Sequence, residues 1–127
     1  MSYKIDLHTH SIISYDGGIT EKQYRKILEM GILDYVAITD HNETRFAGIM
    51  QKKFGDKIII GEEIKTKEGE IIGLFLKKTI ASGQSTEETA AAIHLQGGLV
   101  YIPHPFETRR KDCKNRFWKE LQVKLIL

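Results

Sequence analysis

Apolar residues along this chain fall into two alternating patterns. Short, mostly apolar runs are typical of strands in the interior of a sheet, and they occur at residues 3–8, 33–39, 57–64, 71–76 and 99–102. Between these runs, apolar residues recur every three or four positions, which is the spacing of an amphipathic helix. This spacing predicts helices that start after Thr20, near Asn42, after Ser85 and from Asp112.

Polar residues mark the ends of these elements. Thr20 is followed by Gln23, and Ser85 by Glu88, so two helices begin with the spacing of a capping box. The run Lys-Glu-Gly-Glu at 67–70 predicts a turn, so a hairpin joins the strands at 57–64 and 71–76. Strands that alternate with helices predict an α/β protein built from βα units around a parallel sheet. About four such units are visible, which is about half of a β/α barrel.

Composition limits the class of protein. The chain has 127 residues, which predicts a single domain (1–127) that is short for a complete barrel of roughly 200 residues or more. A net charge of +2 makes no electrostatic case for nucleic acid or a membrane surface. The apolar stretches are too short for a transmembrane helix, and no signal peptide is recognisable. The single cysteine, Cys113, cannot form an internal disulfide, so we expect a cytoplasmic protein.

Histidines gather at the ends of predicted strands. Residues two apart on a strand point to the same side, so His8 and His10 face one cavity. His41 and His104 follow two further strands, and Glu63 ends a fourth. Imidazoles and carboxylates at equivalent strand ends are what a metal site in an α/β barrel requires. The sequence therefore predicts a metal site at this end of the sheet.

Three residues near this site have more than one interpretation. Glu62 and Glu63 point to opposite faces of their strand, and the pattern does not say which face is inward. Asp40 can orient metal ligands and fix a histidine tautomer, or it can cap the following helix. His94, in the middle of a predicted helix, is interpreted as an ordinary structural residue.

Five short motifs together resemble the PHP family, the polymerase and histidinol phosphatase domain, a relative of the metal-dependent amidohydrolases. The motifs are Asp6-Leu7-His8-Thr9-His10, Ser14-Tyr15-Asp16-Gly17, Ile38-Thr39-Asp40-His41-Asn42, Gly61-Glu62-Glu63-Ile64 and His104-Pro105-Phe106, within residues 3–110. The resemblance implies a distorted seven-stranded β/α barrel, of which this chain holds an incomplete part. It also implies two or three Zn, Mn or Fe ions at the C-terminal ends of the strands.

The same resemblance implies a role for each matching residue. The implied metal ligands are His8 and His10 (first ion), Asp16 and His41 (second ion), Glu63 (bridging) and His104 (third ion). Position within the motif favours Glu63 over Glu62 as the bridging carboxylate. Arg109 and Arg110 follow at the same end of the barrel and either hold a substrate phosphate or form a solvated basic loop.

We therefore expect a metal-dependent phosphoesterase that hydrolyses a small phosphorylated substrate, a phosphomonoester or nucleotide phosphate, through a metal-activated hydroxide. The alternatives are a non-catalytic metal-binding or assembly domain, and C–N hydrolysis of the amidohydrolase type.

Family members carry further ligands after the His-Pro motif, whereas this chain has no histidine beyond His104, and residues 111–127 indicate only a generic amphipathic helix. A domain truncated on its C-terminal side, a half-barrel completed by another subunit, and a vestigial domain all remain open. A half-barrel exposes a sheet edge, so we expect a homo-oligomer.

Overall fold

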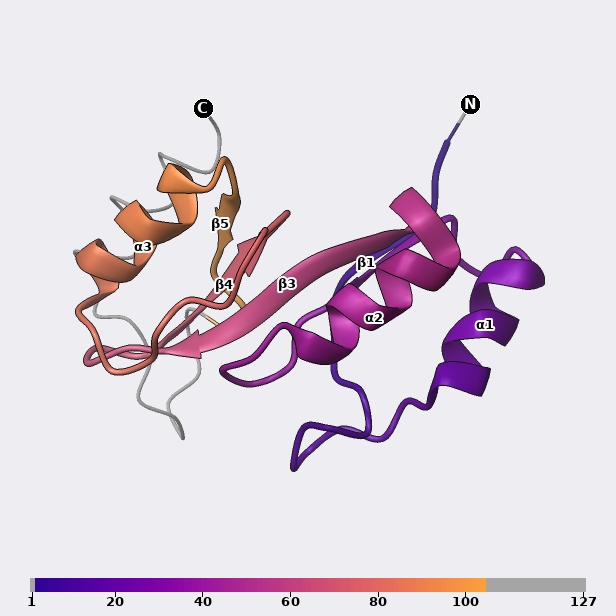
Figure 1. Cartoon of the computed structure of the whole chain (residues 1–127), viewed down its shortest axis with the longest axis horizontal. Coiled ribbons are helices and arrows are strands. Elements are labelled where there is room, and N and C mark those ends of the chain that lie inside the picture. The colour runs from indigo at the N-terminus through magenta and orange to yellow at the C-terminus, as the bar shows by residue number, and fades with distance from the viewer. Residues whose placement is uncertain (1, 105–127) are drawn as a thin grey trace.

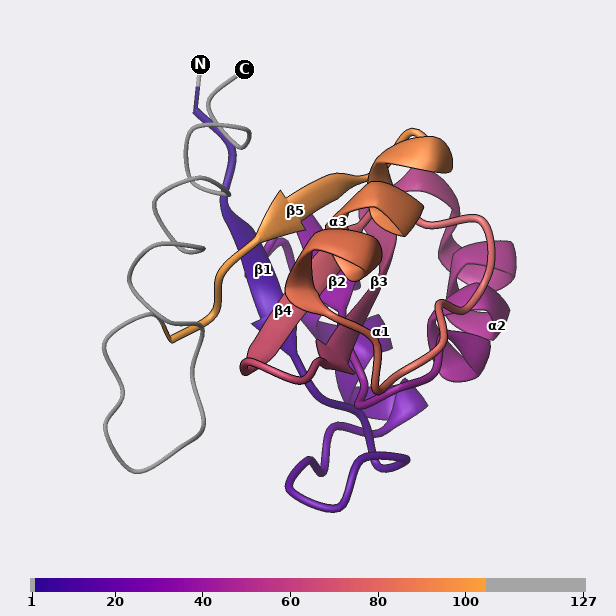
Figure 2. The same ribbon diagram turned by 90° about the vertical axis from the view of Figure 1, so that its left-hand side faces the viewer.

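The computed structural model describes residues 2–104, which form one curled sheet with helices packed on its outer side (Figures 1 and 2). The strands lie side by side in chain order: β1 (Ile5–Thr9), β2 (Tyr35–Ile38), β3 (Ile58–Lys65), β4 (Glu70–Leu74) and β5 (Leu99–Tyr101). The helices are α1 (Glu21–Glu29), α2 (Arg45–Phe54) and α3 (Thr86–Leu95), with the short 3₁₀ helix η1 (Gly55–Lys57) after α2. No helix within residues 2–104 is long and apolar enough to cross a membrane.

The expected incomplete seven-stranded barrel of about four parallel βα units is wrong for the described residues. Only the pairs β1–β2 and β2–β3 are parallel, whereas β4 runs antiparallel to both β3 and β5. The reason is the connection between β3 and β4, which consists of residues 66–69 alone. A parallel crossover needs about 10–12 residues, so a connection this short permits only a hairpin. The result is a mixed five-stranded sheet curled into a half-barrel.

The segment between β4 and α3 decides the direction of β5. Residues 75–85 return along β3: the amide of Leu76 donates to the carbonyl of Ile60, and the amide of Gly83 donates to the carbonyl of Lys65. Helix α3 therefore begins near the end of β3, and β5 runs in the same direction as β1, β2 and β3. As a consequence, four strands finish at one end of the sheet, and β4 begins there.

Alternation along β3 divides the molecule into two faces. Ile58, Ile60 and Ile64 point outward, where Ile60 packs against both of the clusters that the helices cover. Under α1 and α2 the buried residues are Tyr24, Leu28, Val36, Ile38, Ala47, Met50 and Ile58. Under α3 they are Ile64, Ile71, Leu76, Ile80, Ala90, Ile93, Val100 and Ile102. A smaller inner cluster contains Ala37, Ile59, Ile72 and Leu74.

Local signals in the sequence account for most element boundaries. Both predicted capping boxes form, with Thr20 before α1 and Ser85 before α3. Helix α2 starts later than predicted, at Arg45, and its N-cap Thr44 makes no side-chain capping bond. The predicted hairpin is also confirmed. The helix predicted from Asp112 lies outside the described residues.

Two residues of α3 provide a matched test of the outer core. Ile93 is fully buried, whereas Leu95 is 90% exposed. We expect Ile93→Ala to lower the free energy of unfolding by about 2–5 kcal/mol, because it removes buried methyl groups and leaves a cavity. Leu95→Ala should change it by less than about 0.5 kcal/mol. Urea unfolding followed by circular dichroism measures both, and equal effects would contradict this packing.

Candidate metal site

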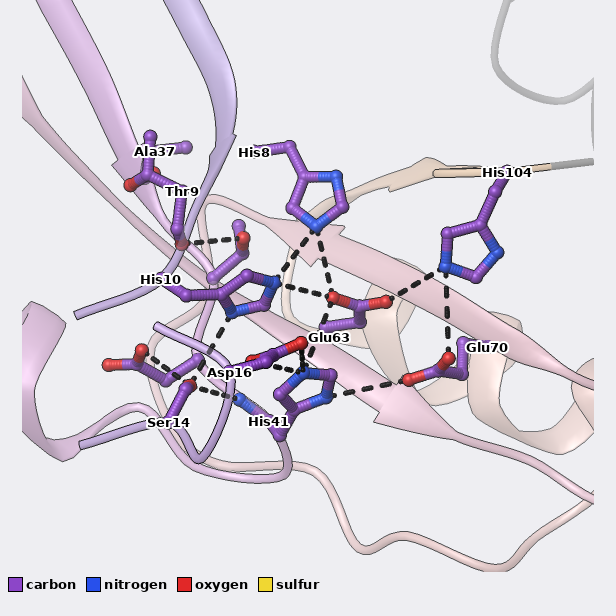
Figure 3. A network of polar contacts seen from close by, with 12 residues as sticks. His8, Thr9, His10, Ser14, Asp16, Ala37, His41, Glu63, Glu70 and His104 are labelled. Atoms are coloured by element: carbon purple, nitrogen blue, oxygen red, sulfur yellow. Dashed lines mark hydrogen bonds and ion pairs between the residues drawn. The ribbon is translucent and has the colours of Figure 1, made fainter. Parts of the chain in front are cut away.

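The six residues expected to ligate metal lie together at the end of the sheet where four strands finish (Figure 3). They are His8, His10, Asp16, His41, Glu63 and His104. His8 lies within β1 and Glu63 within β3. His10 directly follows β1, and His41 lies just beyond β2. The loop between β1 and α1 provides Asp16, and the segment after β5 provides His104. Residues far apart in the sequence therefore converge because their strands end together.

Strand β1 and the residue after it present two histidines to the site because residues two apart on an extended chain point to the same side. The hydroxyl of Thr9 lies 2.8 Å from the hydroxyl of Tyr24 on α1 and donates to the carbonyl of Ala37. Thr9 is thus held on the helix side of the strand. His8 and His10, on either side of it in the sequence, both reach the opposite face.

The carboxylate of Glu63 is the centre of the cluster, and its side chain is only 1% exposed. Its Oε1 lies 3.0 Å from Nε2 of His8 and 2.9 Å from Nε2 of His10. Its Oε2 lies 3.2 Å from Nε2 of His104. The two nitrogens of His8 and His10 are themselves 3.1 Å apart. Three potential metal-ligand atoms, Nε2 of His8, Nε2 of His10 and Oε1 of Glu63, therefore face one point.

These separations fit a small divalent cation. Around a tetrahedral zinc ion with bonds near 2.0–2.1 Å, ligand atoms lie about 3.3 Å apart. The three separations among His8, His10 and Glu63 are close to this value. Two further groups have ligand atoms within 4.8 Å of one another: His10 with Asp16 and His41, and His41 with Glu63 and Glu70. The cluster could therefore hold metal ions.

Asp16 and His41 form the second part of the cluster. Nε2 of His41 lies 3.0 Å from each carboxylate oxygen of Asp16. The ring of His41 stacks on that of His10, with centroids 4.5 Å apart and planes 4° apart. On its other side lies Tyr15, at 4.8 Å, which is 87% exposed. The imidazole of His41 is therefore fixed by ring contacts as well as by Asp16.

Asp40 orients the histidines of the site through hydrogen bonds with the loop after β1, and it does not cap α2. Its Oδ1 accepts hydrogen bonds from the amide of Ser11 (2.8 Å) and the hydroxyl of Ser14 (2.7 Å), and its Oδ2 accepts from the hydroxyl of Ser11. Ser14 in turn accepts from the amide of His41, and its oxygen lies 3.4 Å from Nδ1 of His10. Buried Asp40 thus positions two of the histidines through Ser14.

The two adjacent glutamates of β3 have opposite environments. Glu63 faces the histidines, while Glu62 is fully buried on the outer face with Ile60 and Ile64. The Oε1 of Glu62 accepts from the amide of Ile80 at 2.8 Å, and its Oε2 has no partner among the described residues. Burial raises the pKa of Glu62 to about 7, despite the hydrogen bond from Ile80.

Sequence reasoning missed Glu70, which it placed in a turn. Glu70 is the first residue of β4 and pairs with Lys65, two residues beyond Glu63. Directly paired residues in an antiparallel ladder share a face, so the register of the predicted hairpin already directed Glu70 toward the site. Its Oε2 lies 3.4 Å from Nδ1 of His41, and its Oε1 lies 3.7 Å from Nε2 of His104.

The ionisation of the cluster follows from these contacts. Burial alone would raise the pKa of Glu63, but hydrogen bonds with His10 and His8 outweigh it and hold that pKa well below its usual range. Burial opposes charge on His10 as well, yet its contact with Glu63 raises the pKa of His10. Burial and then the charge of Glu63 raise the pKa of Glu70. The carboxylate of Glu63 is therefore available as a ligand across the neutral pH range.

A hollow of about 460 Å³ adjoins the cluster. His41 and Glu70 form its boundary with the site, and Tyr15 and Lys65 form part of its outer wall. A smaller hollow of about 230 Å³ shares Tyr15, Lys65 and Glu70 and extends to Gly69. A molecule that reaches the cluster can thus extend past an exposed aromatic ring and a cationic side chain.

His94 is exposed on α3, in keeping with its interpretation as an ordinary residue. Arg109 and Arg110 lie outside the described residues, so their expected contact with a phosphate stays a prediction.

Fold and site together define a small α/β protein with a histidine–carboxylate centre at one end of a curled sheet. No family model matches its sequence. The chain is 43% identical over 129 aligned residues to "Uncharacterized protein MJ1587" of Methanocaldococcus jannaschii, an alignment that covers 91% of this chain and 75% of that protein. It is 36% identical to "Uncharacterized protein MJ0417" of the same organism, covering 90% of this chain and 44% of that protein. This chain belongs to the family of MJ1587.

The buried carboxyl of Glu62 predicts a pH dependence of stability. Its pKa is near 4.5 when unfolded and about 7 when folded. The contribution of Glu62 to the free energy of unfolding is fully present below pH 4.5. It is lost as pH rises through 7, because the folded state then holds a buried charge. Glu62→Gln removes this loss. Between pH 5 and pH 8, the free energy of unfolding of the variant should therefore rise by on the order of 2 kcal/mol relative to that of wild type.

Urea unfolding at both pH values, with chelator present, measures this difference. Glu87→Gln, at an exposed position of α3, is the control and should behave as wild type. An equal difference between Glu62→Gln and wild type at pH 5 and pH 8 would contradict the assignment.

Proposed function

We propose that this protein is a metal-dependent phosphoesterase related to the PHP family, acting on a phosphomonoester or nucleotide phosphate. The observation that carries the proposal is the arrangement around Glu63. Three imidazoles, two from β1 and the residue directly after it and one from the segment after β5, contact the two oxygens of one buried carboxylate. A carboxylate placed between imidazoles in this way is suited to bridging two cations. The motif resemblance supports the same reading, since it includes every residue of this arrangement.

The ligand set favours two or three Zn, Mn or Fe ions. His8 and His10 would hold the first with Oε1 of Glu63, and Asp16 and His41 would hold the second. His104 would hold a third with Oε2 of Glu63. Imidazole nitrogen and carboxylate oxygen together suit these borderline ions better than they suit calcium or magnesium. Such ions supply Lewis acidity toward phosphoryl oxygens and a water nucleophile that ionises near neutral pH.

Other side chains of the site would serve binding and orientation. Asp40 and Ser14 hold His10 and His41 in place, so that little reorganisation is needed when substrate arrives. The hollow beside the cluster would receive the part of the substrate that does not react. Lys65 offers a positive charge there, and the free face of Tyr15 offers a surface for a flat or apolar group.

A non-catalytic metal-binding or assembly domain is the second candidate, and one observation favours it. The described sheet closes only half a barrel, and both of its outer strands carry exposed apolar side chains, Ile5 on β1 and Leu99 on β5. Such edges favour self-association, in keeping with the homo-oligomer expected from the sequence.

Cytoplasmic location and C–N hydrolysis of the amidohydrolase type also remain proposals. A substrate panel distinguishes C–N hydrolysis from phosphate ester cleavage.

Substitution of the first pair of histidines tests the enzyme. We expect His8→Ala and His10→Ala each to lower hydrolysis of p-nitrophenyl phosphate or a nucleoside monophosphate by about 100-fold or more, since each removes a metal ligand. Activity of the wild type should fall below about pH 6, because imidazole ligands must be deprotonated. Initial rates with added Mn²⁺ or Zn²⁺ measure both effects, beside circular dichroism as a check on folding.

His94→Ala is the matched control, since His94 is exposed on α3, and it should retain full activity. Two results would count against the enzyme. One is a wild-type protein that binds two or more ions yet cleaves no phosphate ester. The other is loss of folding or assembly, rather than of turnover, in His8→Ala and His10→Ala, which would indicate a structural metal.

A further inference from the structure

Glu70 enters the cluster from the one strand that runs the other way. Because β4 is antiparallel to β3 and β5, its first residue lies at the end of the sheet where the other strands finish. The side chain is 21% exposed, and each of its two oxygens faces a different histidine. Oε2 lies 3.4 Å from Nδ1 of His41, and Oε1 lies 3.7 Å from Nε2 of His104. Figure 3 shows both contacts.

Glu70 also faces a second carboxylate. Ligand oxygens of Glu63 and Glu70, together with a ring nitrogen of His41, lie within 4.8 Å of one another. Two carboxylates this close repel each other in a largely buried site unless a cation or a proton lies between them. Nε2 of His104 faces both, at 3.2 Å from Glu63 Oε2 and 3.7 Å from Glu70 Oε1. One nitrogen and two carboxylate oxygens are therefore directed at a common volume.

The contact with His41 has a different consequence. Nε2 of His41 faces Asp16 at 3.0 Å, so its other nitrogen, Nδ1, is directed at Oε2 of Glu70. A carboxylate beside Nδ1 favours the tautomer that carries its proton there, which leaves the lone pair of Nε2 free for a cation shared with Asp16. Glu70 can thus orient one ligand while it serves as another.

We propose that Glu70 is a metal ligand that completes a third cation site with Glu63 and His104, and that its second oxygen positions His41 for the neighbouring ion. This inference rests on the metal centre of the proposed function, and it adds a ligand from β4 that the sequence motifs do not include. It also supplies a donor at a site for which the described chain offers only two of the expected ligands. The ligand would be a divalent ion such as Mn²⁺ or Zn²⁺.

Metal stoichiometry of the full chain tests the ligand role. Protein stripped with chelator is equilibrated with Mn²⁺, and bound metal is measured by plasma mass spectrometry and by calorimetric titration. We expect Glu70→Gln to bind one ion fewer per chain than wild type. Glu29→Gln, at an exposed position at the end of α1, is the control and should keep the full number. An unchanged number of ions with unchanged affinity in Glu70→Gln would overturn the proposal.

A second variant and a second readout keep the test decisive if Glu70→Gln folds poorly. Glu70→Asp keeps the charge but withdraws the carboxylate by one methylene, and it should lose the same ion. The positioning role is read from ¹⁵N chemical shifts of His41, which report the proton on Nδ1 in wild type and a mixture of tautomers in Glu70→Gln. Identical shifts in the two proteins would overturn that role.

The test of Glu70 as a metal ligand can fail or succeed independently of the test of phosphoesterase activity. A wild type that binds three ions, loses one in Glu70→Gln and hydrolyses no phosphate ester supports the ligand role and defeats the phosphoesterase. A wild type that hydrolyses phosphate esters and binds the same number of ions as Glu70→Gln defeats the ligand role alone. A wild type that binds less than one ion per chain defeats the ligand role as well.

Discussion

The burial of one carboxylate, that of Glu63, imposes the arrangement of everything around it. A carboxylate that is 1% exposed is stable only when hydrogen-bond donors or cations surround it. Its backbone is fixed on the β2 side, where its amide donates to the carbonyl of Asp40 and its carbonyl accepts from the amide of Asn42, and it lies opposite Ile72 of β4 on the other side. Its oxygens then require His8, His10 and His104, so the strands that carry them must finish at the same end of the sheet.

Alternation along β3 keeps this requirement separate from the stability of the fold. Odd and even positions face opposite sides, so the residues that pack under the helices are not those that form the site. The adjacent Glu62 and Glu63 show the consequence most clearly. Glu62 lies among outer-face residues, where burial favours its neutral form, whereas Glu63 lies among imidazoles that favour its charge. Strand alternation thus places two identical side chains in surroundings that shift their pKa values in opposite directions.

Local features could be predicted from the sequence because they depend on neighbours in the chain. The capping boxes at Thr20 and Ser85, and the hairpin turn predicted at 67–70 and found at 66–69, involve residues only a few positions apart. The gathering of histidines at strand ends was also predictable, because it needs only the alternation of strands and helices. The returning segment at 75–85, which brings the chain back along β3 before α3 and β5, was not predictable, because its hydrogen bonds to β3 have no signature in the pattern.

The error about the barrel and the omission of Glu70 have one origin. An interpretation in terms of repeated βα units expects every strand to bring its last residues to the site, so the first residue of a strand is not considered. The hairpin that the sequence also predicts is incompatible with that interpretation, because its four-residue connection at 66–69 reverses β4 and brings a strand start to that end. Residue types at predicted strand ends were therefore an incomplete guide to the site. The register of the hairpin, which places Glu70 opposite Lys65 and on the face of Glu63, was the signal that completes it.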